Sequence, residues 1–134
     1  MAKKKATVLQ GLQEDRTRVT IFLPAQNMKH VRAIRKINVY LHSQRKSKSC
    51  QIKGFTTTVN QLTPYFGVWW SPKKKDWISE KVTLLTVDYA KRLDDKNLEN
   101  SMRRLKQAIL DSYKHFGDEQ EEIWMVASSV VRFA

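Results

Sequence analysis

Acidic residues are almost absent from the first part of this sequence. Residues 1–75 contain 16 lysines and arginines but only two acidic residues, Glu14 and Asp15, which gives a net charge of +14. Residues 76–134 contain nine basic and 11 acidic residues, a net charge of −2. Solubility requires no such segregation of sign, whereas a one-sided positive potential attracts polyanions over about 10 Å at moderate salt. The first part of the chain is therefore the predicted binding part.

Cysteine, glycine and long apolar runs are scarce as well. The single cysteine, Cys50, excludes an internal disulfide, and we interpret it as a lone thiol in a loop because no activating base is near it in the sequence. With 4 glycines, the chain has no glycine-rich phosphate loop. Its apolar runs are too short for a membrane span, and its start does not have the pattern of a signal peptide. We expect a cytoplasmic protein with no cofactor and no membrane partner.

The stretch from Tyr65 to Ala90 has the pattern of a β-hairpin. Apolar residues alternate from Phe66 to Trp70, a Ser-Pro pair and three lysines break the run, and residues 78–89 resume an extended, β-branched pattern. The return strand is apolar at successive positions, as in a strand that is covered on both faces. We therefore expect a basic hairpin tip and a central strand.

Further strands are predicted at residues 18–23, 37–42 and 54–62, where apolar and polar residues alternate. The end of the chain, residues 123–134, fits either a helix or a strand; its β-branched content favours a strand, which we expect beside residues 78–89. Residues 1–15 show neither period, and we interpret them as a flexible basic N-terminal arm.

Residues 94–116 have the pattern of one long amphipathic helix. Apolar residues recur at steps of three and four, at Leu98, Met102, Leu105, Ile109, Tyr113 and Phe116. Asp94 or Asp95 suits the N-cap, and Gly117 suits the C-terminal end. Together these elements predict an α+β fold: a single domain over residues 16–134, with an antiparallel or mixed sheet of four to six strands and the helix packed on one face.

Basic clusters and neighbouring aromatic residues define a candidate nucleic-acid interface. Closely spaced cations, as in the acid-free loop 44–53, can follow a phosphate backbone, and aromatic rings beside them can stack on bases. Trp69 and Trp70 are adjacent, so their side chains must point to opposite faces of the strand. The predicted contacts are Lys3, Lys4, Lys5, Arg45, Lys46, Lys48, Tyr65, Trp69, Lys73, Lys74 and Lys75. We expect the protein to bind RNA or single-stranded DNA, or another polyanion, without catalysis.

A small nuclease is the first alternative. Without a metal, His42, Tyr40, Arg45 and Lys46 would transfer protons and stabilise phosphate charge. With a metal, Asp88, Asp94 and Asp95 would be the ligands.

The acidic segment Lys91–Leu98, KRLDDKNL, resembles the acidic segment of RusA-type Holliday junction resolvases of phages. That resemblance implies Mg²⁺-dependent cleavage of branched DNA. It is confined to the junction between the hairpin and the helix, and an acidic pair at a helix start is also what an N-cap requires. We therefore favour Asp94 and Asp95 as capping residues and assign no metal site and no family.

A protein-interaction domain is the second alternative. The tryptophans could fill an interface instead of stacking on bases, and a homodimer through the exposed aromatic face would then be expected.

Overall fold

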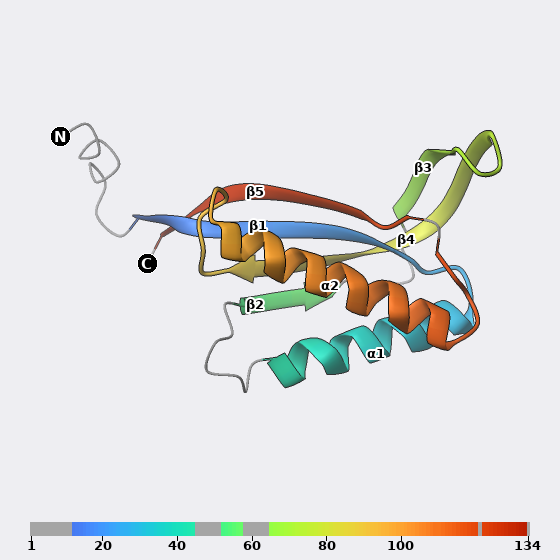
Figure 1. Ribbon diagram of the computed structural model, residues 1–134, viewed down its shortest axis with the longest axis horizontal. Coiled ribbons are helices and arrows are strands. Elements are labelled where there is room, and N and C mark those ends of the chain that lie inside the picture. Colours follow the sequence, from blue (N-terminus) through green and yellow to red (C-terminus); the bar gives the residue numbers. More distant parts are fainter. Residues whose placement is uncertain (1–11, 45–51, 58–64, 121, 134) are drawn as a thin grey trace.

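The computed structural model describes residues 12–44, 52–57, 65–120 and 122–133, and the structural statements below concern these residues (Figure 1). The elements follow in the order β1 (Leu12–Pro24), α1 (Met28–Gln44), β2 (Ile52–Thr57), β3 (Tyr65–Ser71), β4 (Asp76–Tyr89), α2 (Lys96–His115) and β5 (Trp124–Phe133).

The strands form one antiparallel, five-stranded sheet in the order β2-β4-β1-β5, and β3 pairs with the first part of β4. The length of β4, 14 residues, explains this arrangement. Its second part lies between β1 and β2, while its first part continues past β2 and forms the hairpin with β3. The hairpin therefore projects from one end of the sheet (Figure 1).

Both helices pack on the same face of the sheet and on each other (Figure 1). The register places Val19 opposite Val87 and Ile21 opposite Leu85, and these four side chains are buried under the helices. Burial raises the pKa of the Tyr113 hydroxyl in α2, which donates a hydrogen bond to the carbonyl oxygen of Pro24 at 2.7 Å. The other face of the sheet is covered by no helix among the described residues.

The α+β class is confirmed, as are the hairpin, the helix in the second half and the strand at the end of the chain. Asp95 is the N-cap of α2, because its side chain accepts a hydrogen bond from the Asn97 N–H at 2.7 Å. Gly117 follows the helix with φ of 78°, a left-handed conformation that favours glycine.

The prediction of a strand at residues 37–42 is wrong, because this segment belongs to α1. The alternation of Ile37, Val39 and Leu41 suggested a strand, but Val39 is 68% exposed. Asn27 caps this helix, since its Oδ1 accepts a hydrogen bond from the His30 N–H at 3.0 Å. The sheet buries instead a stripe at helical spacing, made of His30, Ala33, Ile34, Ile37 and Leu41. The domain therefore has two helices on its sheet, not one.

Two placements in the sheet also differ from expectation. β5 pairs with β1 and not with residues 78–89, because β4 is already flanked by β1 on one edge and by β2 and β3 on the other. β1 begins at Leu12, so the last residues of the predicted arm 1–15 belong to the sheet. β2 covers the first part of the predicted strand 54–62, whose remainder lies outside the described residues, as does Cys50. No helix in the described ranges is long and apolar enough to cross a membrane.

Candidate functional site

The inner side of the β3–β4 hairpin carries an aromatic groove. Tyr65 and Trp69 point to this side together, since they are four residues apart on one strand. Phe22 of β1 and Trp124 of β5 complete a cavity of about 240 Å³, and the rings of Trp69 and Trp124 are 6.4 Å apart between centroids. Trp70 points to the outer side, where its ring meets that of Trp77. Of the two adjacent tryptophans, only Trp69 therefore belongs to the groove.

A second cavity of about 600 Å³, here called the Glu80 pocket, adjoins this groove. Trp69 and Glu80 line both cavities. Lys73 and Lys74 of the hairpin turn also line the pocket, and Asp118 comes from the segment between α2 and β5. Three predicted contacts, Trp69, Lys73 and Lys74, are thus brought to one pocket.

The hairpin turn holds its lysines in a defined position. The Lys74 N–H donates a hydrogen bond to the Ser71 Oγ at 3.0 Å, and the Lys75 N–H donates to the Ser71 carbonyl oxygen at 2.7 Å. Lys75 has φ of 53°, the left-handed conformation that closes such a turn. Lys75 does not line the pocket, although it is exposed beside Lys74.

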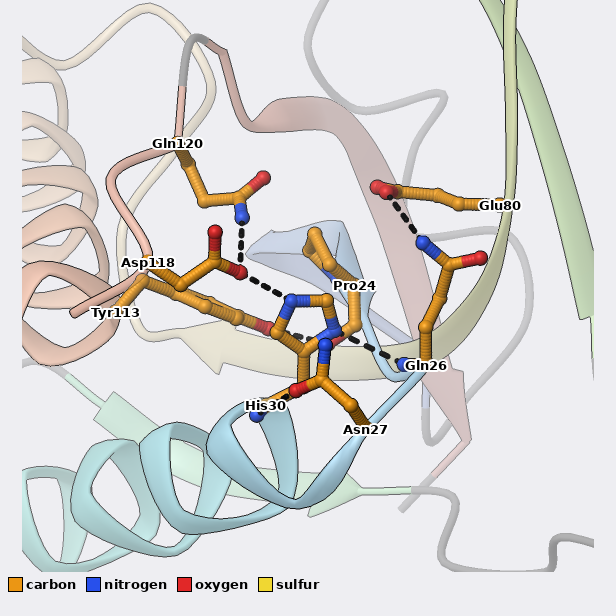
Figure 2. A network of polar contacts seen from close by, with 8 residues as sticks. All are labelled: Pro24, Gln26, Asn27, His30, Glu80, Tyr113, Asp118 and Gln120. Atoms are coloured by element: carbon orange, nitrogen blue, oxygen red, sulfur yellow. Dashed lines mark hydrogen bonds and ion pairs between the residues drawn. The ribbon is translucent and has the colours of Figure 1, made fainter. Parts of the chain in front are cut away.

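A buried histidine, His30, joins three segments beside the pocket (Figure 2). Its Nδ1 accepts a hydrogen bond from the Gln26 backbone N–H at 2.9 Å, so its proton is on Nε2, which donates to Asp118. Gln120 also donates to the Asp118 carboxylate, at 3.0 Å. Because both ring nitrogens are engaged, His30 positions Asp118 and is not free to act as a general base.

Glu80 is the most unusual ionisable group of the pocket. Its residue is 9% exposed, and the Gln26 Nε2 donates a hydrogen bond to its Oε2 at 3.2 Å (Figure 2). Burial raises the pKa of the carboxyl group from 4.5 to about 7; the charge of Asp118 adds to the rise and that of Lys74 opposes it. A carboxyl group with such a pKa in a pocket is a candidate functional group.

The raised pKa gives a prediction about stability. The folded state binds the Glu80 proton more tightly than the unfolded state, so the stability that this proton confers is complete below pH 4.5 and is lost as the pH rises through about 7. Glu80→Gln cannot lose a proton there. We expect the variant to be more stable than the wild type by about 1 to 3 kcal/mol near pH 8 and equal to it near pH 4. Urea unfolding at both pH values tests this, and an equal difference at both would contradict it.

The structure describes only some of the other residues that were predicted to contact nucleic acid. Tyr65 is 51% exposed and lines the groove. Lys3, Lys4, Lys5, Arg45, Lys46 and Lys48 lie outside the described residues.

The carboxylates considered for a nuclease have other partners. Asp88 forms two hydrogen bonds with Arg18, at 2.8 and 3.1 Å, and this contact raises the pKa of the Arg18 guanidinium. Asp94 is exposed, 3.5 Å from Arg92, and Asp95 caps α2. In the part of the chain that is described, no group of three His, Cys, Asp or Glu side chains is placed to hold a metal ion.

Tyr40 and His42, considered for a metal-independent nuclease, lie on α1. His42 packs edge-on against Phe55, with ring centroids 5.0 Å apart, and Tyr40 packs against the core. Their predicted partners Arg45 and Lys46 are outside the described residues.

A row of cations on α1 was missed because the segment was interpreted partly as a strand. Lys29, Arg32 and Lys36 follow each other at steps of three and four residues, so they lie on one side of the helix, with Arg35 beside them. All four side chains are exposed, and none is in an ion pair with a described residue. Lys29 lies next to the segment that supplies Asp118, since its Nζ is 4.0 Å from the point that a Cβ on Gly117 would occupy. Helical spacing, applied to residues 28–44, would have found this row.

The element order and the strand order define the class of the fold. Without β3, the chain reads β-α-β-β-α-β, with β4 inserted between β1 and β2, which is the split βαβ arrangement of ferredoxin-like folds. β3 is an addition to this arrangement.

Among the comparisons with known proteins, the one with solved structures finds a similar fold. No protein-family model and no curated protein matches the chain. A solved structure described as the crystal structure of a Bacillus cereus protein related to NIF3 is similar, with a TM-score of 0.50 and 10% sequence identity. The match covers 94% of this chain and 30% of that protein, so the chain spans less than a third of its length. At this identity the similarity concerns the fold alone.

Proposed function

We propose that this protein binds single-stranded nucleic acid, RNA or DNA, through the inner side of the β3–β4 hairpin and without catalysis. The observation that carries the proposal is the meeting of one aromatic ring and two cations at one pocket: Trp69, Lys73 and Lys74. An aromatic ring stacks on a base and a lysine contacts its phosphate, which is the combination that single-strand-binding proteins use.

The groove favours a single strand over a duplex. The rings of Tyr65, Trp69 and Trp124 can contact base faces only where the bases are unstacked. Open four-stranded sheets of this class are known platforms for such contacts, but a fold alone does not define a function. The support here comes from the side chains.

The cations of α1 supply phosphate contacts beyond the hairpin. Lys29 lies at the pocket end of the row, and Arg32 and Lys36 continue it along the helix away from the pocket. A strand with a base at Trp69 could therefore continue along α1. A cytoplasmic location, as expected from the single cysteine, would give the protein access to RNA.

The outer side of the hairpin supports the homodimer alternative. Phe66, Val68, Trp70 and Trp77 are exposed there, with 64%, 56%, 47% and 64% of their surfaces accessible. Sedimentation velocity, measured with and without nucleic acid, separates a dimer through this face from a monomer that binds nucleic acid.

Adjacent tryptophans provide the test of the proposed function. Trp69→Ala is expected to weaken the binding of labelled uridine-rich RNA by roughly tenfold, the value of one lost stacking contact. Trp70→Ala is the matched control, because this ring is on the outer side of the hairpin, and it should leave the affinity unchanged. Fluorescence anisotropy gives the affinity, and circular dichroism verifies that both variants are folded. Equal affinities of wild type and Trp69→Ala, or no binding at all, would refute the proposal; Mg²⁺-dependent shortening of the RNA would favour the nuclease.

A further inference from the structure

The Glu80 carboxylate has acceptor capacity that the protein does not use. The residue is 9% exposed, and the Gln26 Nε2 is its one hydrogen-bond donor among the described residues. Its Oε1 has no donor among the described residues, and Glu80 lines the pocket. Leaving a buried acceptor unsatisfied costs free energy, so a ligand with N–H groups would recover what the protein leaves open.

The charges around the pocket restrict the kind of ligand. Among the described residues, three further carboxyl groups line it, those of Asp118, Glu119 and Glu122. They disfavour a phosphate group deep in the pocket. Lys73 and Lys74 at the same pocket offset part of this negative charge and oppose a cationic side chain beside them. A flat, uncharged group with N–H donors meets neither objection, and Trp69 offers a ring face for it.

The hairpin places the Trp69 ring and Glu80 next to each other. Gly67 pairs with Glu80 across the hairpin, and a Cβ at this position would stand 3.8 Å from the Trp69 ring. The Trp69 ring therefore lies beside the β3 backbone at Gly67, opposite Glu80. One ring face and one carboxylate border the same space.

Among nucleobases, guanine best matches a carboxylate. Its N1–H and N2–H₂ groups are adjacent donors on one edge, whereas adenine and cytosine present a donor beside an acceptor there and uracil presents one donor between two acceptors. A carboxylate offers acceptors only. We propose that the Glu80 pocket binds a guanine base, with Glu80 accepting from N1–H and N2–H₂, Trp69 against the base and Lys73 and Lys74 near the adjoining phosphate. This inference rests on the proposed function and adds a base preference to it.

The preference should depend on pH, because a protonated Glu80 is a donor as well as an acceptor. Burial and the charge of Asp118 raise the pKa of Glu80 to about 7, and the charge of Lys74 opposes this rise. Among the described residues, the other charged or titratable groups near Glu80 and its pocket are Lys73 of the turn, Glu119 and Glu122 of the segment before β5, His30 of α1 and Tyr113 of α2. Near pH 8 Glu80 is ionised and should select guanine, and near pH 6 the selection should weaken.

The test compares RNA strands that differ in one base. Labelled strands of about ten uridines carry guanosine, adenosine, cytidine or uridine at the centre, and anisotropy measures their affinities near pH 8 and pH 6. We expect the guanosine strand to bind roughly tenfold more tightly than the others near pH 8, the discrimination typical of one bidentate contact. Glu80→Gln should abolish this preference, so that the guanosine and uridine strands bind the variant with equal affinity. Asp111→Asn, an exposed carboxylate on α2, is the control of equal charge.

Each outcome separates this inference from the proposed function. If all four strands bind equally well, or if Glu80→Gln keeps the guanosine preference, the guanine pocket is refuted while nucleic-acid binding stands. If no strand binds, both proposals fail. Competition with guanosine monophosphate shows whether the guanine belongs to a strand or to a free nucleotide. If guanosine monophosphate displaces the labelled strand at low concentration, a free nucleotide, not a base within a strand, is the ligand.

Discussion

Replacing Ile109 by alanine is expected to destabilise the protein by about 2 to 5 kcal/mol, the range for large-to-small changes at closely packed sites. Ile109 is 0% exposed, in the middle of α2, where the helix meets the sheet. Its neighbours on the stripe, Leu105 and Tyr113, are also buried, and Tyr113 is fixed to β1 by its hydrogen bond to Pro24. A rigid surrounding of this kind cannot collapse into the space left by the missing atoms, so the loss should be in the upper part of the range.

Val39→Ala is the matched control for this prediction. Both residues are β-branched and helical, but Val39 is 68% exposed, and its truncation should change stability by less than about 0.5 kcal/mol. Urea unfolding followed by circular dichroism gives both values. An unchanged midpoint for Ile109→Ala would mean that α2 does not pack on the sheet. A large loss for Val39→Ala would mean that Val39 is not on the exposed side of α1.

The sequence predicted those elements whose periodicity is unambiguous. The stripe of α2 is long and separated by polar residues, and the two strands of the hairpin are interrupted by a proline and lysines that suit only a turn. The prediction for the segment that forms α1 failed because its apolar residues fit both the period of a strand and that of a helix. Ile37, Val39 and Leu41 alternate, yet Ile34, Ile37 and Leu41 also form a helical stripe. Only packing decides between them, and packing against the sheet buries the helical set.

The sequence predicted the cations and the aromatic ring of the Glu80 pocket, but it did not predict the acidic residues of this pocket. Lys73, Lys74 and Trp69 belong to one short segment, so their proximity follows from the hairpin. Glu80 meets Gln26 from 54 positions away, and His30 meets Asp118 from 88 positions away. A single glutamate near the start of a predicted strand gives no indication in the sequence that its side chain is buried. Its raised pKa comes first from burial in the folded chain, and the charge of Asp118, which the segment before β5 brings to the same pocket, adds to the rise.

Reversing three charges on α1 is expected to have the largest effect on nucleic-acid binding. The variant Arg32→Glu, Arg35→Glu, Lys36→Glu removes exposed cations that have no ion-pair partner among the described residues, so their charge is available to phosphates. We expect a loss of on the order of a hundredfold in affinity near 0.1 M salt. The steepness of the plot of log affinity against log salt should fall by about 2 to 3, because each phosphate contact that is lost removes the release of about one counterion.

The control places the same change of charge on the other helix. Arg104→Glu, Lys106→Glu, Lys114→Glu alters three exposed cations of α2 and leaves α1 and the hairpin intact. If polyanion binding follows the segregated charge of the first 75 residues, the α2 variant should lose far less affinity than the α1 variant and keep the salt dependence of the wild type. Equal losses would mean that total charge, not its location, governs binding. The row on α1 would then be a solvated helix face, and the phosphate contacts would be confined to the hairpin or to the basic residues outside the described ranges.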